Sequence, residues 1–88
     1  MGIRRWIKKR DMKVKVLFFG VLAEVIGTDS KIYMDVKSVD ELKIRILDEF
    51  PELANYRYLV SLNNEIINDN HTTEDGDEVA FMPPFAGG

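Results

Sequence analysis

The sequence predicts an α+β domain in which one main helix lies across one face of a mixed β-sheet of about five strands. Two largely apolar segments of strand length lie near the two ends of the chain, at residues 14–19 and 78–82, and their side chains divide between two faces. Between them, residues 38–50 carry the apolar spacing and the start signal of a helix. The element order strand, strand, helix, strand, short strand, strand fits one sheet covered by one helix.

The composition limits the kinds of protein and site that the chain can form. Its 88 residues suffice for one small domain with a single core. The absence of cysteine excludes disulfides, thiolate zinc sites and cysteine nucleophiles, and the single histidine, His71, excludes a histidine-rich metal cluster. No apolar run is long enough to span a membrane and no secretory signal is recognisable. We therefore expect a cytoplasmic protein.

The net charge of −3 combines two segments of opposite sign. Residues 1–11 carry five basic residues and one acidic residue, and the remainder carries 7 basic and 14 acidic residues. An acidic body disfavours nucleic acid as a partner and suits basic protein surfaces. The basic segment, which contains Trp6, is open to two interpretations: a nucleic-acid or membrane-surface arm, or an extension that is disordered or not native. We favour the extension and expect its removal to leave the fold intact.

The first two strands are predicted to form an antiparallel pair. Residues 14–19 place Val14, Val16 and Phe18 on one face, and Lys15, Leu17 and Phe19 on the other. Gly20 ends this strand, residues 21–26 form a short helical turn, and Gly27 caps it. After a turn, residues 31–36 form the second strand.

The main helix begins at Ser38, which forms a capping box with Glu41. Four apolar residues share a stripe at helical spacing that we assign to the core: Val39, Leu42, Ile46 and Phe50. Arg45 is spaced for ion pairs with Glu41 and Glu49. Pro51 ends the helix.

The second half of the chain completes the sheet. We expect a loop over residues 52–57, a strand over 58–63, a tight turn at Asn64-Glu65 and a short strand after it. His71 falls in a polar loop and is interpreted as solvated. A turn at residues 75–77 leads into the closing strand, 78–82. The first and last strands are expected to pair in parallel at the centre of the sheet.

One helix can cover only one face of this sheet. Leu17, Phe19, Met82 and Ile66 are left for the other face, and an exposed apolar patch of this kind marks a protein interface. The alternative is that the N-terminal extension or loops cover the patch.

The last six residues, 83–88, differ from the rest of the chain. Pro83 and Pro84 restrict the backbone as it leaves the last strand. Gly87 and Gly88 have no side chains and could enter a slot that excludes other pairs. Six extended residues reach about 20 Å. The chemical group on offer is the α-carboxylate of Gly88, although terminal glycines can also be without function.

Three runs, 15–19, 27–29 and 75–88, together resemble the MoaD family, the small sulfur-carrying subunits of molybdopterin synthase. The resemblance covers about residues 12–88 and implies a ubiquitin-like β-grasp fold. It divides the chain into a basic extension (1–11), a β-grasp domain (12–82) and a Gly-Gly tail (83–88).

The resemblance implies a role in molybdenum cofactor biosynthesis. An ATP-dependent adenylating enzyme of the ubiquitin-activating type would activate the Gly88 carboxylate, and a sulfur donor would convert it into a thiocarboxylate. Its sulfur would then attack the pterin precursor inside the large subunit, in a heterotetramer of two small and two large subunits. The chain itself would bind no cofactor or metal, and the acid–base groups would belong to the large subunit.

The same resemblance assigns roles to single residues. Gly88 would carry the sulfur, Gly87 would allow entry into the partner's slot, and Phe85 would pack at its mouth. Pro83 and Pro84 would limit the entropy lost when the tail binds. Phe19, Ile66 and Met82 would form the docking patch. Two other functions fit the same tail: a sulfur carrier for thiamine thiazole synthesis and a ubiquitin-like protein modifier.

Overall fold

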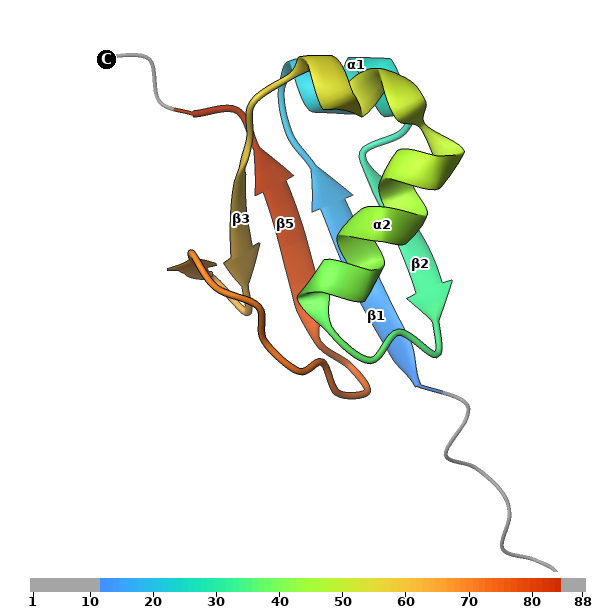
Figure 1. The fold of residues 1–88 in the computed structure, drawn as a ribbon, viewed down its shortest axis with the longest axis vertical. Helices are drawn as coiled ribbons and strands as arrows, with labels where there is room; N and C mark the ends of the chain where they lie inside the picture. Colours follow the sequence, from blue (N-terminus) through green and yellow to red (C-terminus); the bar gives the residue numbers. More distant parts are fainter. Residues whose placement is uncertain (1–11, 85–88) are drawn as a thin grey trace, which may run out of the picture.

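A five-stranded mixed sheet forms the centre of the computed structural model, which describes residues 12–84 (Figure 1). The elements are β1 (Lys13–Phe18), α1 (Val21–Ile26), β2 (Ser30–Met34), α2 (Val39–Glu49), the 3₁₀ helix η3 (Pro51–Asn55), β3 (Leu59–Leu62), β4 (Glu65–Ile67) and β5 (Glu78–Met82). The strand order is β2-β1-β5-β3-β4. β1 and β5 are parallel, and the other neighbours are antiparallel. The predicted fold class and the central parallel pair are confirmed.

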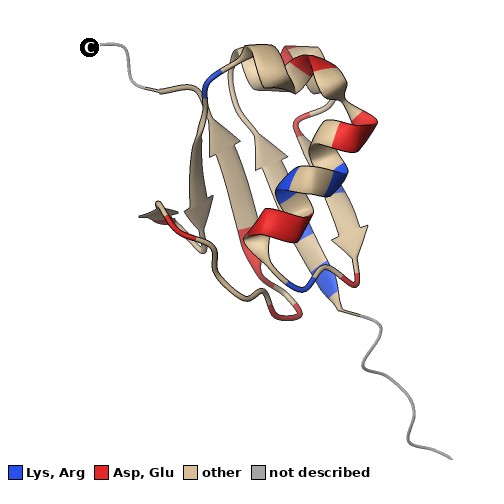
Figure 2. Ribbon diagram, in the orientation of Figure 1, with Lys and Arg blue, Asp and Glu red and all other residues tan. Residues whose placement is uncertain are grey.

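Charge is unevenly distributed over the described residues. Acidic side chains gather at the end of the domain where β1, β5 and α2 begin (Figure 2). Asp40 and Glu41 stand in the first turn of α2, and Glu78 opens β5. The loop before β5 adds Glu74, Asp75 and Asp77. This end of the domain therefore carries more acidic than basic side chains, and the lysines at the start of β1 and before α2 also lie there (Figure 2).

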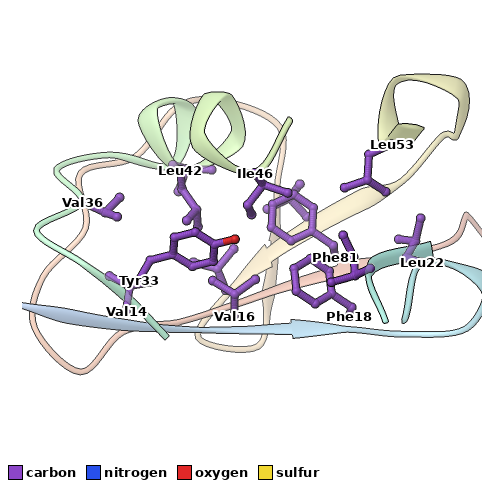
Figure 3. Close-up of a cluster of buried hydrophobic side chains, with 14 residues drawn as sticks. Val14, Val16, Phe18, Leu22, Tyr33, Val36, Leu42, Ile46, Leu53 and Phe81 are labelled. Atoms are coloured by element: carbon purple, nitrogen blue, oxygen red, sulfur yellow. The ribbon is translucent and has the colours of Figure 1, made fainter. Parts of the chain in front are cut away.

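The core lies between α2 and one face of the sheet (Figure 3). Val14, Val16 and Phe18 on β1 are fully buried on this face, as their alternation predicts. Phe81 on β5 stacks on Phe18 with ring centroids 5.8 Å apart, and the edge of Tyr58 meets it at 5.2 Å. Aromatic pairs at these separations add to the stabilisation from burial.

The link from β1 to α1 depends on two glycines with positive φ. Gly20 has φ 60°, and the Leu22 amide donates to the Phe19 carbonyl across it at 3.1 Å. Gly27 has φ 92° and its amide donates to the Ala23 carbonyl at 2.8 Å, which ends α1 at the predicted residue. Both positions disfavour any residue with a Cβ atom.

β2 turns Tyr33 toward the core and leaves Ile32 and Met34 exposed on the opposite face. Strict alternation would place Val36 with Ile32 and Met34, yet Val36 is fully buried. Asp35 adopts a positive φ of 59°, which interrupts the strand and reverses the side on which the next residue lies. Burial, together with a 2.7 Å hydrogen bond that the hydroxyl donates to Glu49, raises the pKa of Tyr33 above its usual value.

The start of α2 follows the predicted capping box with one difference. Ser38 Oγ accepts a hydrogen bond from the Glu41 amide at 3.1 Å. The Glu41 carboxylate, however, accepts from the Lys37 amide at 3.0 Å, one residue before the expected donor. The predicted apolar stripe faces the core, with Val39, Leu42 and Ile46 buried and Phe50 packed against them.

The prediction that Arg45 forms ion pairs with Glu41 and Glu49 along α2 is wrong. Arg45 Nη1 instead donates to the Met34 carbonyl at 2.8 Å, because α2 lies over β2 and brings that oxygen within reach. Glu49 faces Lys31 on β2 at 3.7 Å. Tertiary contacts thus replace contacts along the helix.

Three further expectations in the second half need correction. Residues 51–55 form the helix η3 instead of a loop, because Pro51 at its first position suits a helix start. The hairpin turn is at Asn63-Asn64, since both residues have positive φ, which asparagine tolerates. His71 is half-buried, with Nε2 enclosed and without a hydrogen-bond partner among residues 12–84. Its carbonyl accepts from the Val39 amide and holds the loop against α2.

Candidate functional site

The face of the sheet opposite α2 carries an apolar hollow of about 310 Å³. Phe19, Ile66 and Met82, the three residues predicted to form a docking patch, all line it. Phe19 directly follows β1, Ile66 lies on β4 and Met82 on β5, and the strand order places β1 and β5 side by side with β3 between β5 and β4. The remaining lining residues are Leu17, Ser61, Asn64, Glu78 and Ala80. We call this set of eight residues the open-face patch.

Two side chains of the open-face patch project strongly into solvent. Phe19 is 46 % exposed and Ile66 is 51 % exposed. Phe19 also lines a second hollow of about 490 Å³, which extends toward α1 and includes Gly20, Ala23 and Asp29. Phe19 therefore stands between two hollows as a protruding apolar group. Burying such groups against a partner is favourable, and aromatic residues of this kind dominate many protein interfaces.

Sequence reasoning missed four members of the patch. Glu78 and Ala80 could have been found, because they alternate with the buried Val79 along β5. Ser61 and Asn64 could not, since their position depends on the pairing of β3 with β5 and on the turn at Asn63-Asn64. Ser61 and Asn64 place polar groups beside Ile66.

The tail leaves the domain at the edge of the same patch. β5 is paired with β1 on one side and with β3 on the other. The Phe19 amide also donates to the Phe81 carbonyl at 3.0 Å. β5 is therefore held up to Met82, which lines the patch, and two residues later the described chain ends at Pro84.

Gly20 gives Pro83 room at this exit. A Cβ atom on Gly20 would lie 2.9 Å from Pro83 Cγ, which is closer than real Cβ contacts allow. Pro83 is half-buried and Pro84 is exposed. The other tail residues with predicted roles, Phe85, Gly87 and Gly88, lie outside the described residues, as does the extension 1–11.

The described residues offer little that could perform acid–base or metal chemistry. Within residues 12–84, no group of three His, Cys, Asp or Glu side chains could hold a metal ion. No helix of this part of the chain is long and apolar enough to cross a membrane. Burial raises the pKa of Tyr33 and of Tyr58, but neither residue lines the open-face patch. What the described site offers is a surface and an exit for the tail.

Comparison with known proteins connects this geometry to a family. The ThiS family profile matches residues 16–88. The molybdopterin synthase sulfur carrier subunit of Escherichia coli K12 is 34 % identical, with 85 % of this chain and 99 % of that protein aligned.

Solved structures show the same fold. One matching chain comes from the protein–protein complex of subunits 1 and 2 of the molybdopterin-converting factor from Helicobacter pylori. It superposes with a TM-score of 0.67 at 30 % identity, covering 88 % of this chain and all of that one. Small archaeal modifier protein 1 of Haloferax volcanii has a TM-score of 0.73 at 23 % identity, covering 84 % of this chain and 99 % of that one. The second likeness shows the fold alone. The chain belongs to the ThiS family, and its resemblance to the sulfur carrier subunits of molybdopterin synthase is confirmed.

Proposed function

We propose that this chain is the sulfur carrier subunit of a molybdopterin synthase, and that Gly88 carries the sulfur. The observation that carries the proposal is the alignment with the Escherichia coli sulfur carrier subunit over 99 % of that protein. Partner proteins would bind the β-grasp domain, and the tail that follows Pro83-Pro84 would carry the reactive group into the partner's active site.

The chemistry begins at the Gly88 carboxylate, which is a poor electrophile because its negative charge repels nucleophiles. An ATP-dependent adenylating enzyme would let a carboxylate oxygen attack the α-phosphorus of ATP, forming an acyl-adenylate and releasing pyrophosphate. A sulfur nucleophile would then attack the acyl carbon and displace AMP, leaving a thiocarboxylate. Its sulfur would bond to a carbon of the pterin precursor in the large subunit, which gives a thioester. Water would then cleave the bond between the acyl carbon and the sulfur, so that the sulfur stays on the pterin and Gly88 returns to the carboxylate.

The open-face patch is the proposed docking surface for the large subunit. It combines an exposed aromatic group, Phe19, with a hollow and lies where β5 leads into the tail. A partner seated on the patch would therefore have the tail beside it. After residue 11, the chain has 14 acidic and 7 basic residues, and this acidic balance suits a partner whose interface is bordered by basic residues.

Replacing Phe19 with aspartate should weaken binding to the large subunit by at least about 30-fold, which corresponds to roughly 2 kcal/mol for an interface hot spot. The substitution removes the exposed phenyl ring of Phe19 and would bury a carboxylate charge in the interface. Circular dichroism should not change, because Phe19 is outside the core. Isothermal titration calorimetry of each variant with the large subunit measures the effect.

Ile44→Asp is the matched control. Ile44 is 67 % exposed on α2, which covers the opposite face of the sheet, so this variant should bind as the unmodified chain does. Unaltered binding by Phe19→Asp, or equal loss in both variants, would show that the docking face is assigned wrongly.

A further inference from the structure

β2 forms one edge of the sheet, and among the described residues it is paired with β1 alone (Figure 1). The other edge, β4, has three residues and begins with a glutamate, whereas β2 has five residues. Short edge strands and charged side chains hinder pairing with another chain. On the open face of the sheet, β2 instead presents Ile32 and Met34, which are 56 % and 38 % exposed. β2 is therefore the edge that is better suited to pair with a further strand.

The register with β1 shows which backbone groups of β2 point outward. Next to β2, the Phe18 amide donates to the Asp29 carbonyl at 3.0 Å. In an antiparallel pair, hydrogen-bonded residues alternate with residues whose amide and carbonyl point away from the neighbouring strand. Counted from Asp29 in the observed register, the residues of β2 that point these groups away from β1 are Ser30, Ile32 and Met34.

Side chains already occupy part of these outward groups at both ends of β2. The Thr28 hydroxyl donates to the Ser30 carbonyl at 3.2 Å and accepts from the Ser30 amide at 3.4 Å. Arg45 donates to the Met34 carbonyl at 2.8 Å. In the middle, Ile32 has neither its outward amide nor its outward carbonyl bonded within residues 12–84. The free donor and the free acceptor of this edge thus meet at one residue.

From these observations we infer that two copies of the chain pair through β2, antiparallel, about a twofold axis at Ile32. In this register the Ile32 amide of each copy donates to the Ile32 carbonyl of the other. Ser30 of one copy faces Met34 of the other, and their carbonyls can each accept a second hydrogen bond. The two Ile32 side chains meet on the open face and cover each other. A shift of two residues would set the free groups of Ile32 against the partly occupied groups of Ser30 or Met34.

The charges on the helix side of β2 favour the same register. A hollow of about 310 Å³ there is lined by Tyr33, Arg45, Asp48 and Glu49, which carry two carboxylates and one guanidinium. The twofold pairing places Lys31 of one copy opposite Tyr33 of the other, beside this hollow. A shift of two residues in one direction would place Lys31 opposite Lys31, and like charges directly opposite each other are destabilising.

This pairing is separate from the proposed sulfur transfer. None of the eight residues of the open-face patch belongs to β2, so the pairing leaves that patch and the tail exit free. An interface of one short strand is small, and small interfaces are weak and transient. We therefore expect the dimer at high concentration of the chain, without a partner protein, ATP or sulfur.

Sedimentation equilibrium of the full chain tests the pairing. The mean mass should rise from 10.1 kDa toward twice that value as the concentration increases to about 1 mM. Ile32→Pro should remain at the monomer mass, because proline removes the outward amide and is tolerated where that amide faces solvent. Ile32→Lys should also remain monomeric, since two like charges would face each other. Phe19→Asp, in the open-face patch, should associate as the unmodified chain does.

Cross-linking tests the register, because the chain has no cysteine of its own. In Ile32→Cys the two thiols would belong to a hydrogen-bonded pair with Cα atoms about 5.5 Å apart, a separation that a disulfide spans. Oxidation with diamide should link this variant into a covalent dimer faster than Ile66→Cys. Ile66 is the matched control, since it lies on the other edge strand with a similar exposed fraction of 51 %.

Three results would overturn the inference. A monomer mass at every concentration means that the copies do not pair. Association that Phe19→Asp abolishes, and that the Ile32 variants leave intact, means that the open-face patch joins the copies. Equal or faster cross-linking of Ile66→Cys means that the copies do not meet at Ile32. Circular dichroism checks the fold of each variant, and Ile32→Lys decides the outcome if proline unfolds β2.

Discussion

Replacing Gly87 with valine is expected to lower sulfur transfer to the pterin precursor by at least about 100-fold, the scale on which a misplaced reacting group loses rate. A β-branched side chain next to Gly88 would fill the narrow slot that the tail must enter and would restrict the backbone there. The domain should be unaffected, because the residues of its hydrophobic core all lie before the tail. Molybdopterin formation with the purified large subunit measures the rate.

Ala86→Val is the control for this prediction, since it places the same side chain one residue earlier, outside the Gly-Gly pair. It should cost much less than Gly87→Val. Chemically thiocarboxylated versions of both variants separate transfer from the activating step. Normal product formation by Gly87→Val would contradict the account of why the tail ends in two glycines.

Replacing Phe81 with alanine should have the largest effect on stability. Phe81 is 1 % exposed in the central strand β5, where it contacts the rings of Phe18 and Tyr58. Removing a buried phenylalanine costs about 3–5 kcal/mol, because the apolar burial is lost and a cavity remains. A domain of this size has a total stability of roughly 4–11 kcal/mol. Urea unfolding followed by circular dichroism should therefore show a large fall in the midpoint.

Phe19→Ala provides the comparison, because the same side chain is removed from a position that is 46 % exposed. Its expected cost is about 1 kcal/mol or less, in proportion to the smaller buried area. Together the two variants separate the core role of Phe81 from the surface role proposed for Phe19. Equal destabilisation by both would mean that Phe19 belongs to the core and cannot serve as a free docking group.

Most of the fold could be predicted from the sequence, because local signals and global packing agree. The alternation along β1, the stripe of α2 and the capping glycine Gly27 each match the final structure. The errors occur where one residue changes the backbone direction or where a tertiary partner competes. Asp35 with its positive φ reverses the alternation after β2, and the Met34 carbonyl takes Arg45 away from its helical neighbours.

The candidate site was predicted in part. Phe19, Ile66 and Met82 could be assigned to one face, because the sequence contains a single main helix and a sheet has two faces. The neighbours of these residues could not, since cross-strand register decides which side chains meet. Ser61 reaches the patch only because it pairs with Ala80 on β5. The contact between Gly20 and Pro83 at the tail exit likewise joins residues far apart in sequence and carries no local signal.

The most direct test of sulfur carriage is the intact mass of the chain. The chain is incubated with ATP, an adenylating enzyme of the ubiquitin-activating type and a sulfide source, and the product is then fragmented to locate any change. The proposed function predicts a mass increase equal to the replacement of one oxygen by sulfur, confined to Gly88 and absent without ATP. An unchanged mass, with an enzyme that activates a known carrier in parallel, would contradict the proposal.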